Sequence, residues 1–223
     1  GRGESGEGAD RDGTSADGRA GSNAGSNADS DAEYFFDPVL PPDFTVVLFG
    51  AGHVGRALAQ VLAGLPCRLI WVDSRDDAFP APLPANATAV VTDAPEAEVA
   101  AAPPGSYFLV MTHSHPLDEA LSAAILRRGD VAYFGLIGSA SKRRQFERRL
   151  GARGVAPERL AAMTCPIGVA GIAGKEPGVI AVAVAAQLLQ RRAAMQRAKE
   201  GNSRGLPAAA AADSVIVATG TES

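Results

Sequence analysis

The chain has 223 residues, 46% of them hydrophobic, which is enough to bury the core of about one globular domain. The formal net charge of −4 gives no bias toward polyanions, so we expect no nucleic-acid partner. No apolar run approaches a membrane span and no charged start leads into an apolar signal segment, so we expect a cytoplasmic protein with no membrane partner.

The two ends of the chain differ in composition from its middle. Residues 1–33 contain small, polar and charged residue types, with GSNAGSNA as a short repeat, and are predicted to form a disordered low-complexity linker. Residues 34–196 are predicted to form the folded body. Residues 197–223 are predicted to be a disordered or weakly ordered tail, in which Val215–Ala218 could pair weakly as a strand.

Within the folded body, apolar runs alternate with helical patterns. The predicted strands are Thr45–Phe49, Arg68–Val72, Thr88–Thr92, Tyr107–Met111 and Val131–Ile137. A helix follows the first strand, with Val54, Leu58, Val61 and Leu62 on one face, and further helices are predicted at Ala94–Ala101, Leu117–Arg127, Ser141–Leu150 and Glu176–Arg192. Because the strands are hydrophobic on both faces, the sequence predicts an α/β fold with a Rossmann-like, doubly wound parallel sheet in three αβα layers.

The stretch VVLFGAGHVGRAL carries the first motif, in which Gly50, Gly52 and Gly55 form GxGxxG between a strand and a helix. The first glycine permits a tight turn, the second lets a phosphate approach the backbone, and the third lets the helix pack on the strand. Asp73 ends the next predicted strand, where a carboxylate can accept from a ribose hydroxyl. The three glycines and Asp73 together predict a loop that binds a phosphate group. The alternative is a glycine turn that serves packing alone.

Two further residues bear on the ligand of this loop. His53 lies at the helix start, where it could donate a hydrogen bond to a phosphate or a pterin-like ring, and the alternative is a solvent-facing histidine with no ligand. Arg75 follows Asp73 by two residues and leaves open whether a nucleotide 2′-phosphate is tolerated.

MTHSHPLD follows the fourth predicted strand. His113 and His115 are two residues apart and share one face if the strand continues through them. Asp118 could add a third metal ligand, but HxH with no fixed third partner favours polar contacts to a bound cofactor instead. Plain loop histidines are the remaining alternative, and Pro116 suits the first turn of the following helix.

GLIGSASKRR repeats the order of strand, glycine turn and helix. Its helix is predicted to begin at Ser139 or Ser141, with Lys142 and Arg143 in the first turn. Cations are unfavourable at this positive end of the helix dipole, so their presence predicts an anion nearby. A basic solvated helix face is the alternative.

The chain has two cysteines and no CxxC, so neither a disulfide framework nor a cysteine zinc site is predicted. Cys67 is expected to be a buried thiol. Cys165 begins the glycine-rich loop CPIGVAGIAGKEPG, which is expected to lie over the ligand end of the sheet. A soft metal such as molybdenum favours sulfur, and a small buried side chain is the alternative for Cys165.

Four ordered motifs, GAGHVG, MTHSHPLD, GLIGS followed by a basic pair, and PIGVAGIAGKEP, together resemble the XdhC/CoxI family of xanthine dehydrogenase accessory proteins over about residues 44–191. The resemblance implies a C-terminal Rossmann-like domain that binds the molybdenum cofactor (molybdopterin) and assists its sulfuration and insertion. It implies a chaperone rather than an enzyme. The partners that it implies are apo-xanthine dehydrogenase, the cysteine desulfurase that sulfurates the cofactor, and a second copy of the chain in a homodimer.

The resemblance also implies which residues hold the cofactor. They are Gly50, Gly52, His53, Val54 and Gly55 in the glycine loop, Asp73 and Arg75 beside it, and Thr112, His113, His115, Gly138, Ser139, Lys142 and Arg143 along the pocket. Two features depart from the family: low-complexity residues precede the Rossmann domain where relatives have an N-terminal domain, and Ser114 stands where many carry an acid. An NAD(P)-dependent oxidoreductase and a nucleotide-sensing module remain the competing hypotheses, although no separate substrate domain is evident.

Overall fold

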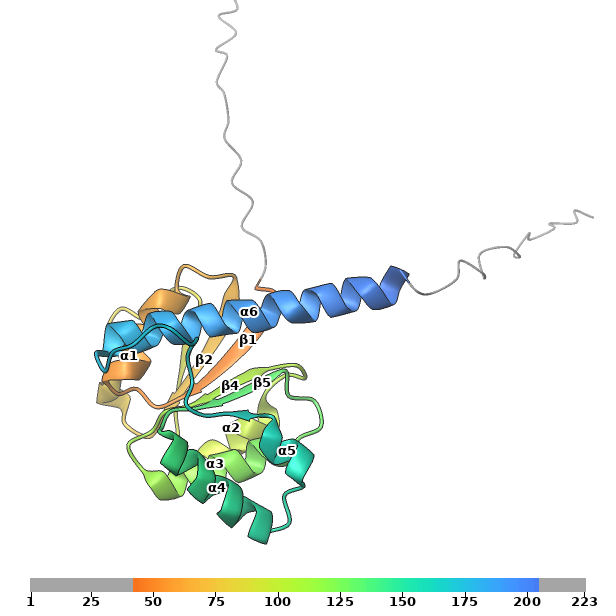
Figure 1. Ribbon diagram of the computed structural model, residues 1–223. Coiled ribbons are helices and arrows are strands. Elements are labelled where there is room, and N and C mark those ends of the chain that lie inside the picture. Colours follow the sequence, from red (N-terminus) through yellow and green to blue (C-terminus); the bar gives the residue numbers. More distant parts are fainter. Residues whose placement is uncertain (1–41, 205–223) are drawn as a thin grey trace, which may run out of the picture. The chain divides into compact units, whose positions relative to one another are not determined.

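The computed structural model describes residues 42–204 (Figure 1). The strands are β1 (Phe44–Phe49), β2 (Cys67–Asp73), β3 (Ala87–Val91), β4 (Tyr107–Val110), β5 (Tyr133–Leu136) and β6 (Met163–Thr164). The helices are α1 (His53–Leu62), the short 3-10 helix η1 (Asp76–Ala78), α2 (Pro95–Ala101), α3 (His115–Arg127), α4 (Ala140–Ala152), α5 (Pro157–Ala161) and α6 (Pro177–Arg204). The predicted linker and the predicted pairing of Val215–Ala218 lie outside the described residues.

All six strands are parallel, in the order β3-β2-β1-β4-β5-β6. Val46 of β1 is in register with Leu69 of β2 on one side and with Tyr107 of β4 on the other. The strand order reverses between β1 and β4, and doubly wound sheets bind ligands outside the carboxyl ends of the strands at such a point. The predicted Rossmann-like sheet is therefore confirmed, and it locates the crevice at the ends of β1 and β4.

The alternation of side chains along each strand produces two apolar layers. Val46 and Leu48 of β1 pack with α1 and α6, whereas Val47 and Phe49 pack with α2, α3 and α4. Figure 1 shows α1 and α6 on one side of the sheet and α2 to α5 on the other. The three-layer αβα arrangement follows, because both faces of the sheet are hydrophobic and each needs a helical cover.

Several elements were not predicted, or not with these bounds. β6 has two residues and α5 has five, too few for periodicity to reveal them, and neither was predicted. The predicted helix end at Arg192 is wrong, because α6 continues to Arg204, past the predicted end of the folded body at Gln196. Residues 193–200 are mostly Ala, Gln, Arg, Lys and Met, which have high helix propensity and extend the helix past its last buried turn.

Helix α6 has 28 residues, a length that would suffice to span a bilayer if it were apolar. Its second half carries Arg191, Arg192, Arg197 and Lys199. Among residues 42–204, no helix combines the length and the apolar character that crossing a membrane requires.

Candidate functional site

The glycine loop between β1 and α1 is built as its sequence predicts. Gly50 has φ +110°, and a Cβ at this position would lie 2.5 Å from the carbonyl oxygen of Met111. A Cβ at Gly55 would lie 2.1 Å from the carbonyl oxygen of Gly50. The first glycine is needed for the turn and the third for helix packing, since neither position has room for a side chain.

Gly52 differs from its two neighbours in the motif. A Cβ there would meet no atom within 4 Å, and the backbone at φ −74° is one that any residue adopts. Gly52 is also the N-cap of α1, and no side chain caps the helix. The N–H groups of the first helical turn are therefore left to solvent or to a ligand, at the positive end of the helix dipole.

Asp73 at the end of β2 holds the same loop from the side. Its Oδ2 accepts from the N–H of Ala51 at 2.7 Å, and Arg75 binds both carboxylate oxygens at 2.9 and 3.0 Å. Burial alone would raise the pKa of Asp73, but the hydrogen bonds from Arg75 and Ala51 outweigh it and lower the pKa to about 2. Asp73 is therefore ionised at neutral pH and braces the loop.

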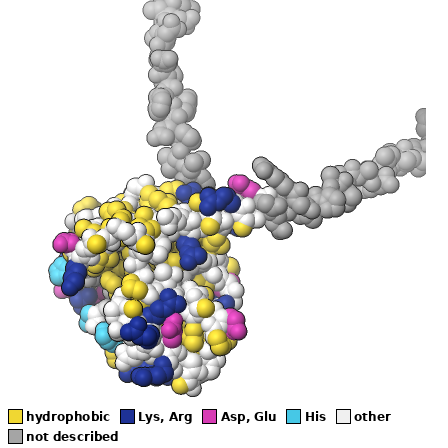
Figure 2. Space-filling view, viewed as in Figure 1, with side chains coloured by type: hydrophobic (Ala, Val, Ile, Leu, Met, Phe, Trp, Pro, Cys, Tyr) yellow, Lys and Arg dark blue, Asp and Glu magenta, His cyan; other side chains and the backbone are white. Residues whose placement is uncertain are grey.

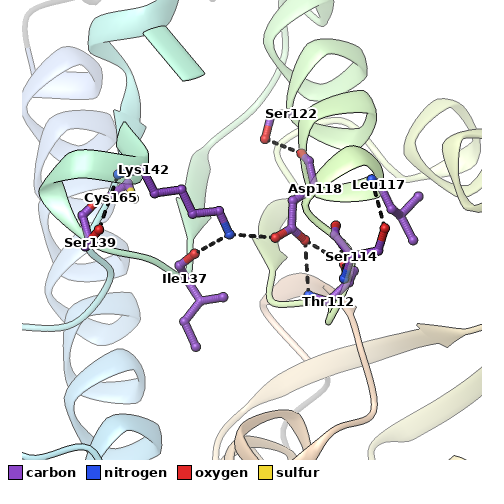
Figure 3. Close-up of polar contacts among 9 residues, drawn as sticks. All are labelled: Thr112, Ser114, Leu117, Asp118, Ser122, Ile137, Ser139, Lys142 and Cys165. Atoms are coloured by element: carbon purple, nitrogen blue, oxygen red, sulfur yellow. Dashed lines mark hydrogen bonds and ion pairs between the residues drawn. The ribbon is translucent and has the colours of Figure 1, made fainter. Parts of the chain in front are cut away.

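A buried ion pair between Asp118 of α3 and Lys142 of α4 lies beside the ends of β4 and β5 (Figure 3). The ammonium group of Lys142 lies 2.6 Å from Oδ2 of Asp118 and donates to the carbonyl oxygen of Ile137 at 2.9 Å. Asp118 Oδ1 accepts from the Thr112 hydroxyl at 2.7 Å and from its N–H at 3.2 Å. The Asp118 side chain is fully buried, so the loops after β4 and β5 are tied together through one carboxylate.

Lys142 and Arg143 lie in the first turn of α4, where their positive charges predicted a nearby anion. Ser139 is the N-cap, and its hydroxyl accepts from the N–H of Lys142 at 3.2 Å. The stem of Lys142 passes over Gly138, where a Cβ would lie 2.5 Å from its Cδ. The anion that faces Lys142 is Asp118 of the protein itself, and Arg143 pairs with Glu147 one turn along α4.

His113, His115 and Asp118, which were considered as metal ligands, do not lie together. β4 ends at Val110 and α3 begins at His115, so the two histidines do not share a strand face. Asp118 points to Thr112 and Lys142. Within residues 42–204 there is no group of three His, Cys, Asp or Glu side chains able to hold a metal ion.

A cleft opens at the carboxyl ends of β1, β2 and β4, and it has two hollows that share Gly50, Asp73, Thr112 and His113. The first, of about 390 Å³, lies against α1 and is also lined by Gly52, His53, Val54, Gly55, Arg75, Met111 and Ile137. The second, of about 210 Å³, lies against α2 and α3 and is also lined by Phe49, Val72, Ser74, Thr92, Asp93, Pro95, Glu96, Leu117 and Leu121. We call the first the loop hollow and the second the acidic hollow.

Nine of the predicted cofactor-binding residues line this cleft: Gly50, Gly52, His53, Val54, Gly55, Asp73, Arg75, Thr112 and His113. The other five, His115, Gly138, Ser139, Lys142 and Arg143, line neither hollow. Sequence reasoning missed Thr92, Asp93 and Glu96, although Thr92 ends a predicted strand and Asp93 directly follows it, which is the position that ligand-binding residues occupy in such sheets. Figure 2 shows the histidines along one edge of this view, beside acidic and basic side chains.

Cys165 lies directly after β6, away from both hollows. Its thiol is buried, 3.8 Å from the carbonyl oxygen of Ser139. Burial raises the pKa of Cys165, although the charges of Lys142 and Arg143 act in the opposite direction. Cys67 is buried as predicted, and burial raises its pKa to about 11. Both thiols are protonated at neutral pH and are weak nucleophiles.

We expect both thiols of the native chain to react with Ellman's reagent at pH 8 about 100-fold more slowly than free cysteine, because each is buried and protonated. The absorbance of released thionitrobenzoate measures the rate. The same chain unfolded in guanidinium chloride should release two equivalents rapidly, which controls for prior oxidation. Fast release of one equivalent from the native chain, mapped to Cys165 by mass spectrometry, would contradict this expectation.

Comparison with known proteins places these features in a family. The profile of the XdhC Rossmann domain matches residues 46–188. YqeB, an uncharacterized protein of Escherichia coli (strain K12), is 34% identical over 148 residues, which are 65% of this chain and 27% of YqeB. The chain thus spans about a quarter of the length of this relative.

A solved structure shares the fold. The crystal structure of a protein from Bacillus halodurans described as a xanthine dehydrogenase superposes with a TM-score of 0.59 and 21% sequence identity, covering 70% of this chain and 46% of the other. At this identity the likeness supports the fold alone. The family profile covers well over half of the chain and includes the glycine loop, Asp73 and the Asp118–Lys142 pair. The chain therefore belongs to the XdhC family, through its Rossmann domain.

Proposed function

We propose that the chain is an accessory factor for xanthine dehydrogenase that binds the molybdenum cofactor and assists its sulfuration and insertion into the apoenzyme. The observation that carries this proposal is the open, uncapped start of α1 at Gly52, which faces a cleft in a member of the XdhC family. The cofactor is a pyranopterin with a terminal phosphate, and a helix N-terminus with free N–H groups favours phosphate.

The residues of the cleft suit the two ends of such a molecule. The loop hollow adds His53, His113 and the guanidinium of Arg75 to the N–H groups, and all of these can donate to a phosphate. The acidic hollow adds the carboxylates of Asp93 and Glu96, which can accept from the N–H groups of a pterin ring. The cleft thus offers donors at one end and acceptors at the other.

The state of the two cysteines supports a carrier more than a sulfur-transfer enzyme. A sulfur donor needs a thiolate or persulfide in reach of its acceptor, whereas Cys67 and Cys165 are buried and line neither hollow. We therefore propose that the sulfur comes from a separate cysteine desulfurase, and that this chain holds the cofactor while the desulfurase acts.

The two histidines of MTHSHPLD provide a matched test of the proposal. Both are exposed, but His113 lines both hollows and His115 begins α3 outside them. We expect His113→Ala to raise the dissociation constant for the molybdenum cofactor about tenfold, through loss of one hydrogen bond to a charged group. His115→Ala should change it less than about twofold.

Binding is measured by mixing the purified full chain with molybdenum cofactor, separating free from bound by ultrafiltration, and oxidising the bound fraction to a fluorescent pterin. The melting temperature of each variant controls for folding. A wild-type chain that retains no pterin but is stabilised by NAD would overturn the proposal. Equal loss of binding in both histidine variants would contradict the placement of the cofactor in the hollows that His113 lines.

A further inference from the structure

We infer that Arg75 closes the ribose position of this Rossmann cleft, so that the site selects against ligands that present a nucleoside diol at the end of β2. The inference rests on the proposed function, because it specifies which phosphate ligands the same cleft accepts. It concerns Asp73 and Arg75, which are the residues that a dinucleotide would need to meet there.

The carboxylate of Asp73 has no acceptor position to spare. Oδ2 accepts from the Ala51 N–H at 2.7 Å and from Nη2 of Arg75 at 3.0 Å. Oδ1 accepts from the backbone N–H of Arg75 at 3.1 Å and from its Nε at 2.9 Å. An ionised carboxylate offers about four lone-pair positions, so these four donors fill it.

A ribose diol can bind Asp73 only after Arg75 has moved away. The two contacts from the Arg75 side chain form a bidentate pair, which is the stronger and better-oriented kind of arginine–carboxylate contact. The Arg75 side chain is nevertheless 49% exposed, so it can be removed without opening the core. The two other donors, the N–H groups of Ala51 and Arg75, belong to the backbone and remain when residue 75 is replaced with alanine.

This arrangement predicts a gain of nucleotide binding when the arginine side chain is lost. In Arg75→Ala, one position on each oxygen of Asp73 becomes free for the 2′- and 3′-hydroxyl groups of an adenosine ribose. We expect the dissociation constant for NAD, measured by isothermal titration calorimetry with the full chain, to fall about tenfold. The affinity for NADP should not increase, because the freed carboxylate of Asp73 repels a 2′-phosphate.

Two controls separate this effect from a simple change of charge. Arg148 lies exposed on α4, away from the cleft, and Arg148→Ala removes the same charge without freeing Asp73. Asp73→Asn combined with Arg75→Ala removes the negative charge and one of the two acceptor oxygens, so a ribose diol can no longer bind both, and the gain should be cancelled. If Arg75→Ala leaves NAD binding unchanged, or if wild type already binds NADP through Arg75 and loses it in the variant, the inference is overturned.

Retention of the molybdenum cofactor, measured for wild type and for the same variants, distinguishes failure of the proposed cofactor binding from failure of the role inferred for Arg75. If wild type retains the pterin and Arg75→Ala does not gain NAD, only the role of Arg75 is refuted. If wild type retains no pterin but Arg75→Ala gains NAD, the cleft is a nucleotide site and the proposed cofactor is refuted.

Discussion

Replacing Lys142 with methionine is expected to lower the free energy of unfolding by about 3 kcal/mol. The ammonium group lies 2.6 Å from a fully buried carboxylate, and methionine keeps an unbranched side chain only one atom shorter while removing the charge. Asp118 would then retain only the two donors of Thr112 for a charge that water cannot reach. Urea denaturation of the full chain, followed by circular dichroism, measures the change.

The neighbouring residue supplies a matched control. Arg143 lies one position along α4, and its ion pair with Glu147 is one-third exposed at both side chains. Arg143→Met should therefore cost less than about 1 kcal/mol. Replacing both partners of the buried pair, in Asp118→Asn with Lys142→Met, should recover at least half of the loss. Equal stability of Lys142→Met and Arg143→Met would indicate that Lys142 faces solvent and is free to contact a ligand.

The Lys142 result bears on why only part of the site was predictable from sequence. A cation in the first turn of a helix indicates an anion nearby, and Lys142 does face one, the carboxylate of Asp118. The pattern does not distinguish a bound phosphate from a carboxylate of the protein, because Asp118 lies 24 residues away along the chain. Only the packing of α3 beside α4 shows that the anion belongs to the protein.

The two histidines illustrate a second limit. Their spacing of two predicts a shared face only in a strand, but β4 ends at Val110 and α3 starts at His115. Strand ends and helix starts are the least certain features of a sequence prediction, and here a shift of a few residues separates one histidine from the cleft. The glycine loop was predictable because its conformation depends on local backbone geometry, which the glycines themselves determine.

Substitutions at two glycines of this loop should affect different properties, Gly55 the stability of the fold and Gly52 the binding of a ligand. We expect Gly55→Ala to lower the free energy of unfolding by about 3 kcal/mol, because its Cβ would lie 2.1 Å from the carbonyl oxygen of Gly50 and either α1 or β1 must shift. Gly52→Ala should leave stability within about 1 kcal/mol of wild type, since its Cβ meets no atom and its backbone suits alanine. Urea denaturation compares the two variants.

Binding of the molybdenum cofactor should follow the opposite pattern for Gly52. A methyl group at this N-cap occupies the space through which a phosphate approaches the first N–H groups of α1, so we expect Gly52→Ala to raise the dissociation constant at least about tenfold while the fold is intact. Gly64→Ala is the matched control, because a Cβ there also meets no atom within 4 Å and Gly64 lines neither hollow. Unchanged pterin retention by Gly52→Ala would mean that the phosphate does not bind at the start of α1, because the added methyl group would block its approach to these N–H groups.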